Sequence, residues 1–283
     1  MKMHPTPFFR EAGAGPSVIC LHANASSSGQ WRALMDSLAP RFHVLAADSY
    51  GHGRSPAWPT DRPVSLRDEV ALLEPLFARA RGPVSLVAHS YGAAVALIAA
   101  LERPDRVHSL ALYEPTLFGL IDEVSPAPND ADGIRSALAV AAAALDAGDP
   151  AGAAQCFVDF WAGPGAWDAT PEERRGPITA SIANIRGWAG ALFNEPTPLR
   201  AFSWLGVPVL YMLGEDSPAP ACGVARVLTP ALPRVQVVEF KGLGHMGPVT
   251  HPEMVNSVIA RFLERHRPFH RSDLHQLAAQ PSR

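Results

Sequence analysis

The composition of this 283-residue chain argues against a charged polymer or a lipid surface as its partner. Charged residues make up 18% of the sequence, hydrophobic residues 47%, and the formal net charge is −3, so no basic surface is available for nucleic acid or anionic lipid. We therefore expect a small-molecule substrate, no nucleic acid and no membrane as partners. The sequence carries no signal for an oligomeric state.

The cysteines and the N-terminal residues point to one cellular compartment. Cys20, Cys156 and Cys222 are an odd number at wide spacing, without a disulfide framework, so we interpret them as thiols in a reducing environment. The first residues contain no apolar stretch suited to a signal peptide. Apolar runs such as 137–145 fall well short of the ~18 residues that span a bilayer. These observations predict a cytoplasmic protein.

Short apolar runs alternate with segments of helical spacing through most of the chain. The strand-like runs are Pro16–His22, His43–Asp48, Pro83–His89, Val107–Tyr113, Val207–Leu213 and Val235–Phe240. Helical spacing occupies Leu66–Ala80, Ala93–Glu102 and Met254–Glu264. This alternation predicts an α/β fold in which a mostly parallel sheet is flanked by helices on both faces.

The alternation breaks between about Leu117 and Trp204, where apolar residues follow helical periods and no strand-like run occurs. Breakers at 148–150 and 163–165 divide this stretch into separate helices. We predict a helical lid over residues 117–204, inserted before the penultimate strand. The core then comprises residues 1–116 and 205–266, and the polar residues 267–283 form a loose C-terminal tail.

The clearest chemical signal is Ala88-His89-Ser90-Tyr91-Gly92, where an apolar strand runs into a small-residue helix. This stretch fits the nucleophile elbow G-x-S-x-G except that Ala88 replaces the first glycine. The turn is sharp, so both flanking positions need small side chains, and alanine is small enough. The helix that begins after Ser90 directs its N-terminal N–H groups toward the place where an oxyanion would form. We predict Ser90 as a nucleophile.

A second signal follows the last strand-like run, in Gly244-His245-Met246-Gly247-Pro248. His245 therefore lies in a loop at the carboxyl end of a strand, which is where a general base for Ser90 is needed. Glycines on both sides and the chain order of serine before histidine favour catalysis over an ordinary surface position.

Four motifs in order resemble the α/β-hydrolase superfamily in its lid-bearing branch. They are the loop at 22–25, D-x-x-G-x-G-x-S at 48–55, the elbow at 88–92 and G-H-M-x-P at 244–248. The glycines of the second motif suggest a tight bend, because no phosphate-binding spacing is present. Only about fifteen residues precede the first clear strand, so the resemblance implies a sheet of seven strands that lacks the family's first one.

The resemblance also implies an oxyanion hole and a carboxylate. Backbone N–H groups of Asn24 and Tyr91 would hold the developing charge. The family's usual acid position is occupied by Ser217, with Asp216 one residue early. Some relatives, including certain haloalkane dehalogenases, use a glutamate after the strand that follows the elbow helix, and Glu114 stands there. Glu114 and Asp216 are both candidates, with Glu114 slightly preferred.

These residues predict a serine hydrolase that needs no cofactor and no metal. It would act on a small, largely apolar ester or related acyl compound through a Ser-His-acid triad and an acyl-enzyme. Phe160, Trp161 and Trp188 of the lid are candidates for contact with substrate. Carbon–carbon bond hydrolysis and cofactor-free perhydrolysis are possible with the same residues, and a non-catalytic receptor for small ligands is the alternative of another class.

Overall fold

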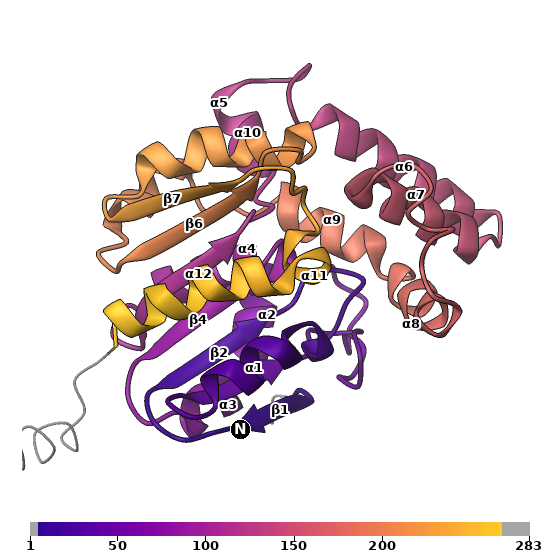
Figure 1. Ribbon diagram of the computed structural model, residues 1–283. Coiled ribbons are helices and arrows are strands. Elements are labelled where there is room, and N and C mark those ends of the chain that lie inside the picture. The colour runs from indigo at the N-terminus through magenta and orange to yellow at the C-terminus, as the bar shows by residue number, and fades with distance from the viewer. Residues whose placement is uncertain (1–4, 268–283) are drawn as a thin grey trace, which may run out of the picture.

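The structure is a computed structural model that describes residues 5–267, and those residues form a seven-stranded sheet (Figure 1). The strand order is β1-β3-β2-β4-β5-β6-β7, and only the pairing of β1 with β3 is antiparallel. The strands are β1 (Phe9–Ala12), β2 (Ser17–Leu21), β3 (His43–Ala47), β4 (Val84–His89), β5 (Val107–Tyr113), β6 (Val209–Gly214) and β7 (Val235–Phe240). The mostly parallel α/β sheet predicted from the alternation is confirmed.

Strand β1 was not among the predicted strands. Its four residues are only partly buried or exposed, because it lies at the edge of the sheet and pairs on one side only. An edge strand of this kind has no reason to carry an apolar run, so hydrophobic patterning does not reveal it.

Helices cover both faces of the sheet, as side-chain alternation in the central strands requires. Val18 and Cys20 of β2 face one hydrophobic cluster, whereas Ile19 and Leu21 face the other. The first face is covered by α1 (Arg32–Leu38) and α12 (Pro252–Arg265). The second face is covered by α2 (Leu66–Leu72), α3 (Glu74–Arg79), α4 (Tyr91–Glu102) and α10 (Ala219–Leu228). Short helical turns complete the core: η1 (Ser28–Trp31), η3 (Thr229–Ala231) and α11 (Gly247–Thr250).

The single helical segment expected over Leu66–Ala80 is two helices in the structure, and this prediction was wrong in that respect. Helix α2 ends at Leu72 and α3 begins at Glu74, with Pro75 in its first turn. A proline lacks the N–H that would continue the preceding helix, whereas it is well tolerated in a first turn. The apolar spacing is unaffected by this break, so periodicity alone does not show it.

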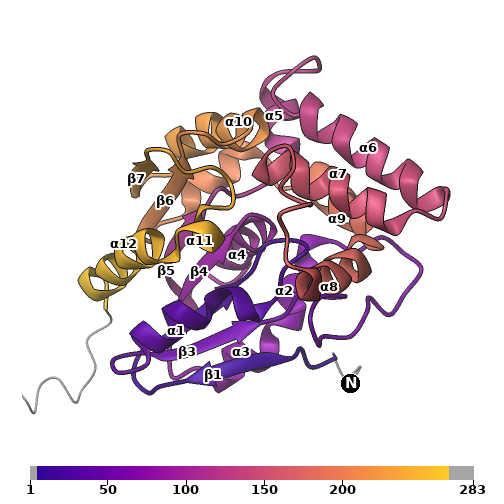
Figure 2. The ribbon, with the colours of Figure 1, turned by 45° about the vertical axis from the view of Figure 1, so that its right-hand side comes forward.

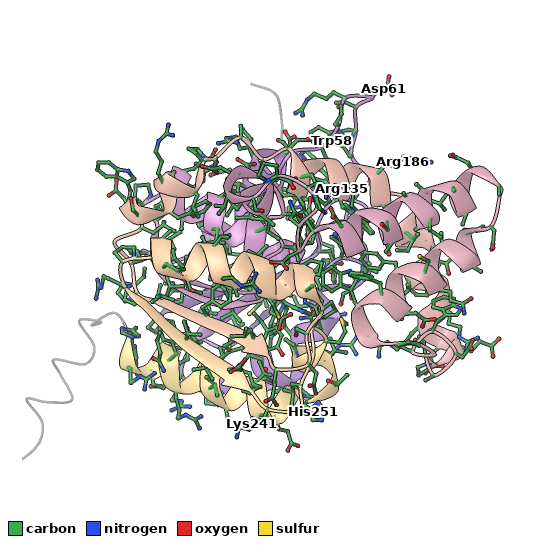
Figure 3. All side chains as sticks on the ribbon, turned by 90° about the horizontal axis from the view of Figure 1, so that it is seen from above. Trp58, Asp61, Arg135, Arg186, Lys241 and His251 are labelled. Atoms are coloured by element: carbon green, nitrogen blue, oxygen red, sulfur yellow. The ribbon has the colours of Figure 1, made fainter. Side chains whose placement is uncertain are left out.

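The stretch between β5 and β6 is helical throughout (Figures 1 and 2). It contains α5 (Gly119–Val124), α6 (Asp132–Asp146), α7 (Pro150–Ala162), α8 (Glu172–Ile182), α9 (Ile185–Phe193) and η2 (Leu199–Trp204). Gly148 and Gly163 have φ angles of 75° and 97°, and they separate α6 from α7 and end α7. We refer to α5–α9 as the helical block; its action as a lid stays a prediction. Seen from above, the block projects to one side of the core (Figure 3).

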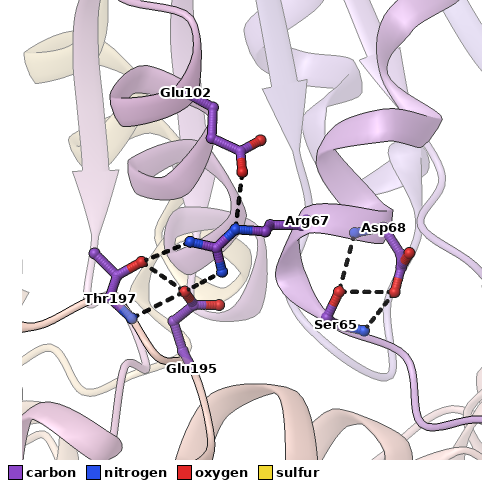
Figure 4. A network of polar contacts seen from close by, with 6 residues as sticks. All are labelled: Ser65, Arg67, Asp68, Glu102, Glu195 and Thr197. Carbon is purple, nitrogen blue, oxygen red and sulfur yellow. Dashed lines mark hydrogen bonds and ion pairs between the residues drawn. The ribbon is translucent and has the colours of Figure 1, made fainter.

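An arginine of the core anchors the end of the helical block (Figure 4). The guanidinium of Arg67 in α2 pairs with Glu102 of α4 at 2.9 Å and with Glu195, just after α9, at 2.7 Å. The start of α2 is itself fixed by a capping box between Ser65 and Asp68. The chain therefore leaves the block at a point that is tied to two core helices.

Two predictions concern the outer parts of the chain. Of the predicted loose tail at 267–283, all but Arg267 lies outside the described residues. Over residues 5–267, no helix has the length and apolar character required to cross a bilayer.

Candidate active site

Ser90 occupies a strained turn between β4 and α4. Its backbone φ of 57° and ψ of −117° lie in a region that costs a non-glycine residue about 1–3 kcal/mol. Gly92 is required on the helix side, because a Cβ there would lie 2.6 Å from the carbonyl oxygen of His22. Ala88 is fully buried in β4, so its methyl group is accommodated where the elbow usually has glycine. The local fold is the sharp strand-to-helix turn predicted from sequence.

Ser90, His245 and Glu114 form a chain of hydrogen bonds. The Ser90 Oγ lies 3.0 Å from His245 Nε2, and His245 Nδ1 lies 2.6 Å from Glu114 Oε2. All three side chains are buried. Because a carboxylate accepts hydrogen bonds, Nδ1 carries the proton toward Glu114, and Nε2 is left to accept from the serine hydroxyl. This is the arrangement in which an imidazole can remove the serine proton.

The sheet fixes the backbone of both the serine and the carboxylate. The Ser90 N–H donates to the Tyr113 carbonyl at 2.9 Å, and the Glu114 N–H donates to the Met212 carbonyl at 3.0 Å. These bonds continue the ladders between parallel strands beyond the carboxyl ends of β4 and β5. Glu114 has a φ of 46°, which turns its side chain out of the alternating strand pattern and toward His245.

The second carboxylate oxygen of Glu114 also accepts hydrogen bonds. Glu114 Oε1 accepts from the Gly214 N–H at 2.6 Å and from the Ser217 hydroxyl at 2.5 Å. Ser217 stands where the family usually has its acid, so in this chain that position supports the carboxylate from a neighbouring strand. Asp216 is exposed and uses its N–H to bond the Leu243 carbonyl. Of the two predicted acids, the structure brings Glu114 and not Asp216 to His245.

The predicted oxyanion donors lie beside Ser90. Tyr91 is the first residue of α4, so its N–H has no carbonyl partner within the helix. Asn24 lines the same cavities as Ser90, and the following residue, Ala25, has a φ of 55° that bends the loop. The roles of Asn24 and Tyr91 as oxyanion donors stay predictions.

A buried histidine that the sequence analysis did not single out connects this loop to His245. His89 Nε2 lies 2.8 Å from the His245 carbonyl oxygen, and Nδ1 lies 3.1 Å from the Gln30 side-chain nitrogen. Gln30 Oε1 in turn accepts from the Ala23 N–H at 3.2 Å. Burial holds the pKa of His89 well below its ordinary value, so the ring is neutral. A neutral ring with its proton on Nε2 satisfies every bond in this chain.

The loop at 48–55 is hydrogen-bonded to the segment that follows Asn24. The buried carboxylate of Asp48 accepts from the Ser28 N–H at 2.5 Å and from the Arg54 N–H at 2.9 Å. Gly51 and Gly53 have φ angles of 67° and 52°, so the motif forms the tight bend that its glycines suggested. Asp48 thereby ties this bend to the turn that follows the Asn24 loop.

Two cavities meet at Ser90. The larger, of about 310 Å³, is lined mainly by apolar side chains, which come from α7, α8 and the segment between them, and from Met246 and α11. The smaller, of about 20 Å³, lies under α6 and α9. Asn24, Ser90, Phe157 and Trp161 line both.

The predicted substrate contacts are distributed unevenly over these cavities. Trp161 lines both, and its ring centre lies 3.9 Å from that of His245. Trp188 lines the smaller cavity and stacks on the buried His52 at 4.7 Å. Phe160 lines neither and packs edge-on against Trp161. Phe157 lines both cavities. It follows the same helical spacing as Phe160, which lines neither, so periodicity alone could not identify Phe157 as a cavity residue.

Comparison with known proteins places this site in a family. The model of the alpha/beta hydrolase fold family matches residues 16–252, which includes all three residues of the hydrogen-bonded chain. The chain belongs to the alpha/beta hydrolase fold family. The resemblance seen in the four sequence motifs is therefore confirmed, and the protein is a member of a hydrolase family.

Similar members of the family cover nearly the whole chain. The (E)-2-((N-methylformamido)methylene)succinate hydrolase of Acinetobacter baylyi is 24% identical over 92% of this chain and 94% of its own. The pimeloyl-[acyl-carrier protein] methyl ester esterase of Chromobacterium violaceum is 26% identical over 91% and 98%. The crystal structure of an alpha/beta hydrolase from Sphaerobacter thermophilus superposes with a TM-score of 0.68, at 24% identity, over 90% and 95%. The last likeness concerns the fold alone.

Proposed function

We propose that this protein is a serine hydrolase that cleaves a small, largely apolar carboxylic ester or related acyl compound. His245 takes the proton of Ser90, and the serine oxygen attacks the acyl carbon. The N–H groups of Asn24 and Tyr91 hold the oxyanion. His245 then gives its proton to the leaving group, and water, activated by the same imidazole, releases the acid from Ser90.

The continuous hydrogen bonding from Ser90 through His245 to Glu114 carries this proposal. A buried serine at an ordinary helix start has no reason to face an imidazole in this way. Here Nε2 of His245 faces Ser90, Nδ1 bonds to Glu114, and the other oxygen of Glu114 accepts two further hydrogen bonds. The apolar walls of the larger cavity support an uncharged body of the substrate.

Covalent labelling tests the nucleophile directly. We expect a fluorophosphonate probe to modify wild-type protein at Ser90, as mapped by mass spectrometry, and to leave Ser90→Ala unmodified. Ser37→Ala, an exposed serine of α1, is the matched control and should label like the wild type. Folded wild-type protein that takes no probe on Ser90 would reject the proposal and favour a non-catalytic receptor for small ligands.

A second candidate is hydrolysis of an acylated amidomethylene dicarboxylate, as in the name of the Acinetobacter relative. Arg174 of α8 favours it, because it is the one Lys or Arg side chain among the described residues that line the larger cavity. No acidic residue lies three or four positions from Arg174 along the chain. A carboxylate of the substrate would therefore find a cation at this wall.

Substrate charge separates the two candidates. If the dicarboxylate is the substrate, wild-type protein should prefer it over a neutral diester of similar size, and Arg174→Gln should raise its KM about fivefold, the value of an exposed ion pair near 1 kcal/mol. Arg200→Gln in η2, another exposed arginine, should leave KM unchanged. A KM that is the same in both variants would reject this candidate and leave the neutral ester.

A further inference from the structure

The larger and the smaller cavity differ in one catalytic residue. His245 lines the larger cavity, together with Met246 and residues of α11, and it does not line the smaller one. Ser90 lines both. A substrate whose acyl carbon lies at Ser90 can therefore place one half in each cavity.

The position of His245 determines which half of the substrate enters which cavity. When the tetrahedral intermediate collapses, the imidazolium gives its proton to the leaving group, so the leaving group has to lie on the His245 side. The larger cavity therefore takes the leaving group. The acyl chain, which receives no proton, extends into the smaller cavity, and we call this cavity the acyl chamber.

The size of the acyl chamber limits the acyl group. Its volume is about 20 Å³, little more than the 10–15 Å³ that one water needs on the same measure. Its walls include side chains that are almost completely buried: Phe118, Ile134, Trp188 and Leu192. Closely packed walls expand only at the cost of their own contacts, so the chamber fits one or two atoms beyond the acyl carbon.

Two residues that line the chamber each contain a buried polar side-chain atom that has no hydrogen-bond partner among the described residues. Among the described residues, neither the Thr116 Oγ1 nor the Asn24 Oδ1 has a hydrogen-bond partner, although both atoms are buried. Thr116 is 2% exposed, and both residues line the acyl chamber. Buried polar atoms are nearly always paired, because leaving one unpaired costs about 1–3 kcal/mol. A hydroxyl on the acyl group could donate to the amide oxygen and accept from the threonine.

From these observations we propose that the acyl chamber is a subsite for a two-carbon acyl group that carries a hydroxyl or a comparable oxygen, with the bulk of the substrate on the leaving-group side. This inference rests on the proposed serine hydrolase function. It divides the substrate at Ser90: a short polar acyl part under α6 and α9, and a larger apolar leaving group under α7 and α8.

An acyl series on one alcohol tests the size limit. With p-nitrophenyl esters, wild-type protein should have a kcat/KM for acetate at least a hundredfold above that for octanoate. Leu138→Ala, which enlarges only the acyl chamber, should raise the butyrate-to-acetate ratio about tenfold. Ile178→Ala, which enlarges only the larger cavity, is the matched control and should leave that ratio unchanged. If Ile178→Ala broadens the acyl range and Leu138→Ala does not, the assignment of the two cavities is reversed and the inference fails.

An isosteric pair of esters tests the polar part. Glycolate and propionate esters of 1-naphthol differ by a hydroxyl in place of a methyl group, and wild-type protein should prefer glycolate at least tenfold. Thr116→Val, equal in shape, should bring the ratio close to one. A wild-type preference for propionate would overturn the hydroxyl requirement.

A further test compares esters on wild-type protein only, so it does not depend on whether any variant folds. With the acyl group fixed as acetyl, exchange of ethanol for 2-(1-naphthyl)ethanol, two alcohols of similar acidity, should change kcat/KM less than exchange of acetyl for octanoyl does. The opposite ranking contradicts the inference while leaving the serine hydrolase function intact. Protein that cleaves no ester and takes no probe on Ser90 would instead overturn the proposed function and this inference with it.

Discussion

The two sides of the candidate site are built in different ways. On the core side, Ser90, Glu114 and His245 follow the ends of β4, β5 and β7, and main-chain bonds between strands fix two of the three. On the side of the helical block, the cavity walls are side chains of α6–α9, held by packing and by a few surface ion pairs. Main-chain hydrogen bonds between strands hold the catalytic atoms in place whatever the neighbouring side chains are, whereas side-chain packing can change with a single substitution. We expect changes on the core side to affect turnover and changes in the block to affect selectivity.

The largest effect should come from the carboxylate behind His245. Glu114→Gln removes the charge that stabilises the imidazolium and offers an amide that can favour the wrong tautomer, so kcat should fall about a thousandfold to ten-thousandfold. Asp216→Asn should stay within about twofold of wild type, because Asp216 is exposed and does not contact His245. Steady-state kinetics on an activated ester measures both, and the reverse ranking would contradict the assignment of Glu114.

A smaller effect on the core side concerns His89, which we regard as a positioning residue. His89→Phe removes the bonds to Gln30 and to the His245 carbonyl, so kcat should fall about tenfold while KM changes little. His89→Gln keeps a donor for that carbonyl and should recover part of the loss. If His89→Phe lowers only the melting temperature and leaves kcat unchanged, the link does not position the catalytic imidazole.

The core also contains a carboxyl group whose burial should make stability depend on pH. Burial raises the pKa of Glu69 to about 8, although the Tyr50 N–H and the Tyr91 hydroxyl bond its oxygens. The folded state keeps this proton between about pH 4.5 and pH 8 while the unfolded state loses it, so this group lowers stability as pH rises through that window, by up to about 1.4 kcal/mol per unit. Urea unfolding of Glu69→Gln should lack this slope. An equal slope in the variant would show that another group causes it.

The smallest expected effect is on the anchor of the helical block. Arg67→Met removes the ion pairs to Glu102 and Glu195. The Arg67 side chain is 44% exposed, and the buried Glu195 carboxylate keeps its bonds from Thr197, so the free energy of unfolding should fall by about 1 kcal/mol. Proteolysis should become faster between α9 and η2, while kcat on an acetate ester stays unchanged. A loss of kcat comparable to that of His89→Phe would show that the helical block also controls turnover, and not selectivity alone.

The sequence by itself determined the alternating fold, the nucleophile turn and the histidine. Those features depend on local chemistry: hydrophobic period, small residues around Ser90 and glycines around His245. It left Glu114 and Asp216 as alternatives, because each follows a strand and sequence position does not say where a side chain turns. The positive φ of Glu114 and the bond from Ser217 decide that question, and both arise only when β5 and β6 lie side by side.

The tertiary structure alone decided the rest of the site. His89, Gln30 and Asp48 each make at least one hydrogen bond to a residue 20 or more positions away, so no spacing reveals their part in the site. The division into a large and a small cavity likewise depends on how α6–α9 pack over Ser90. Local propensity specifies which residues can do chemistry, whereas the packing of distant segments specifies what reaches them.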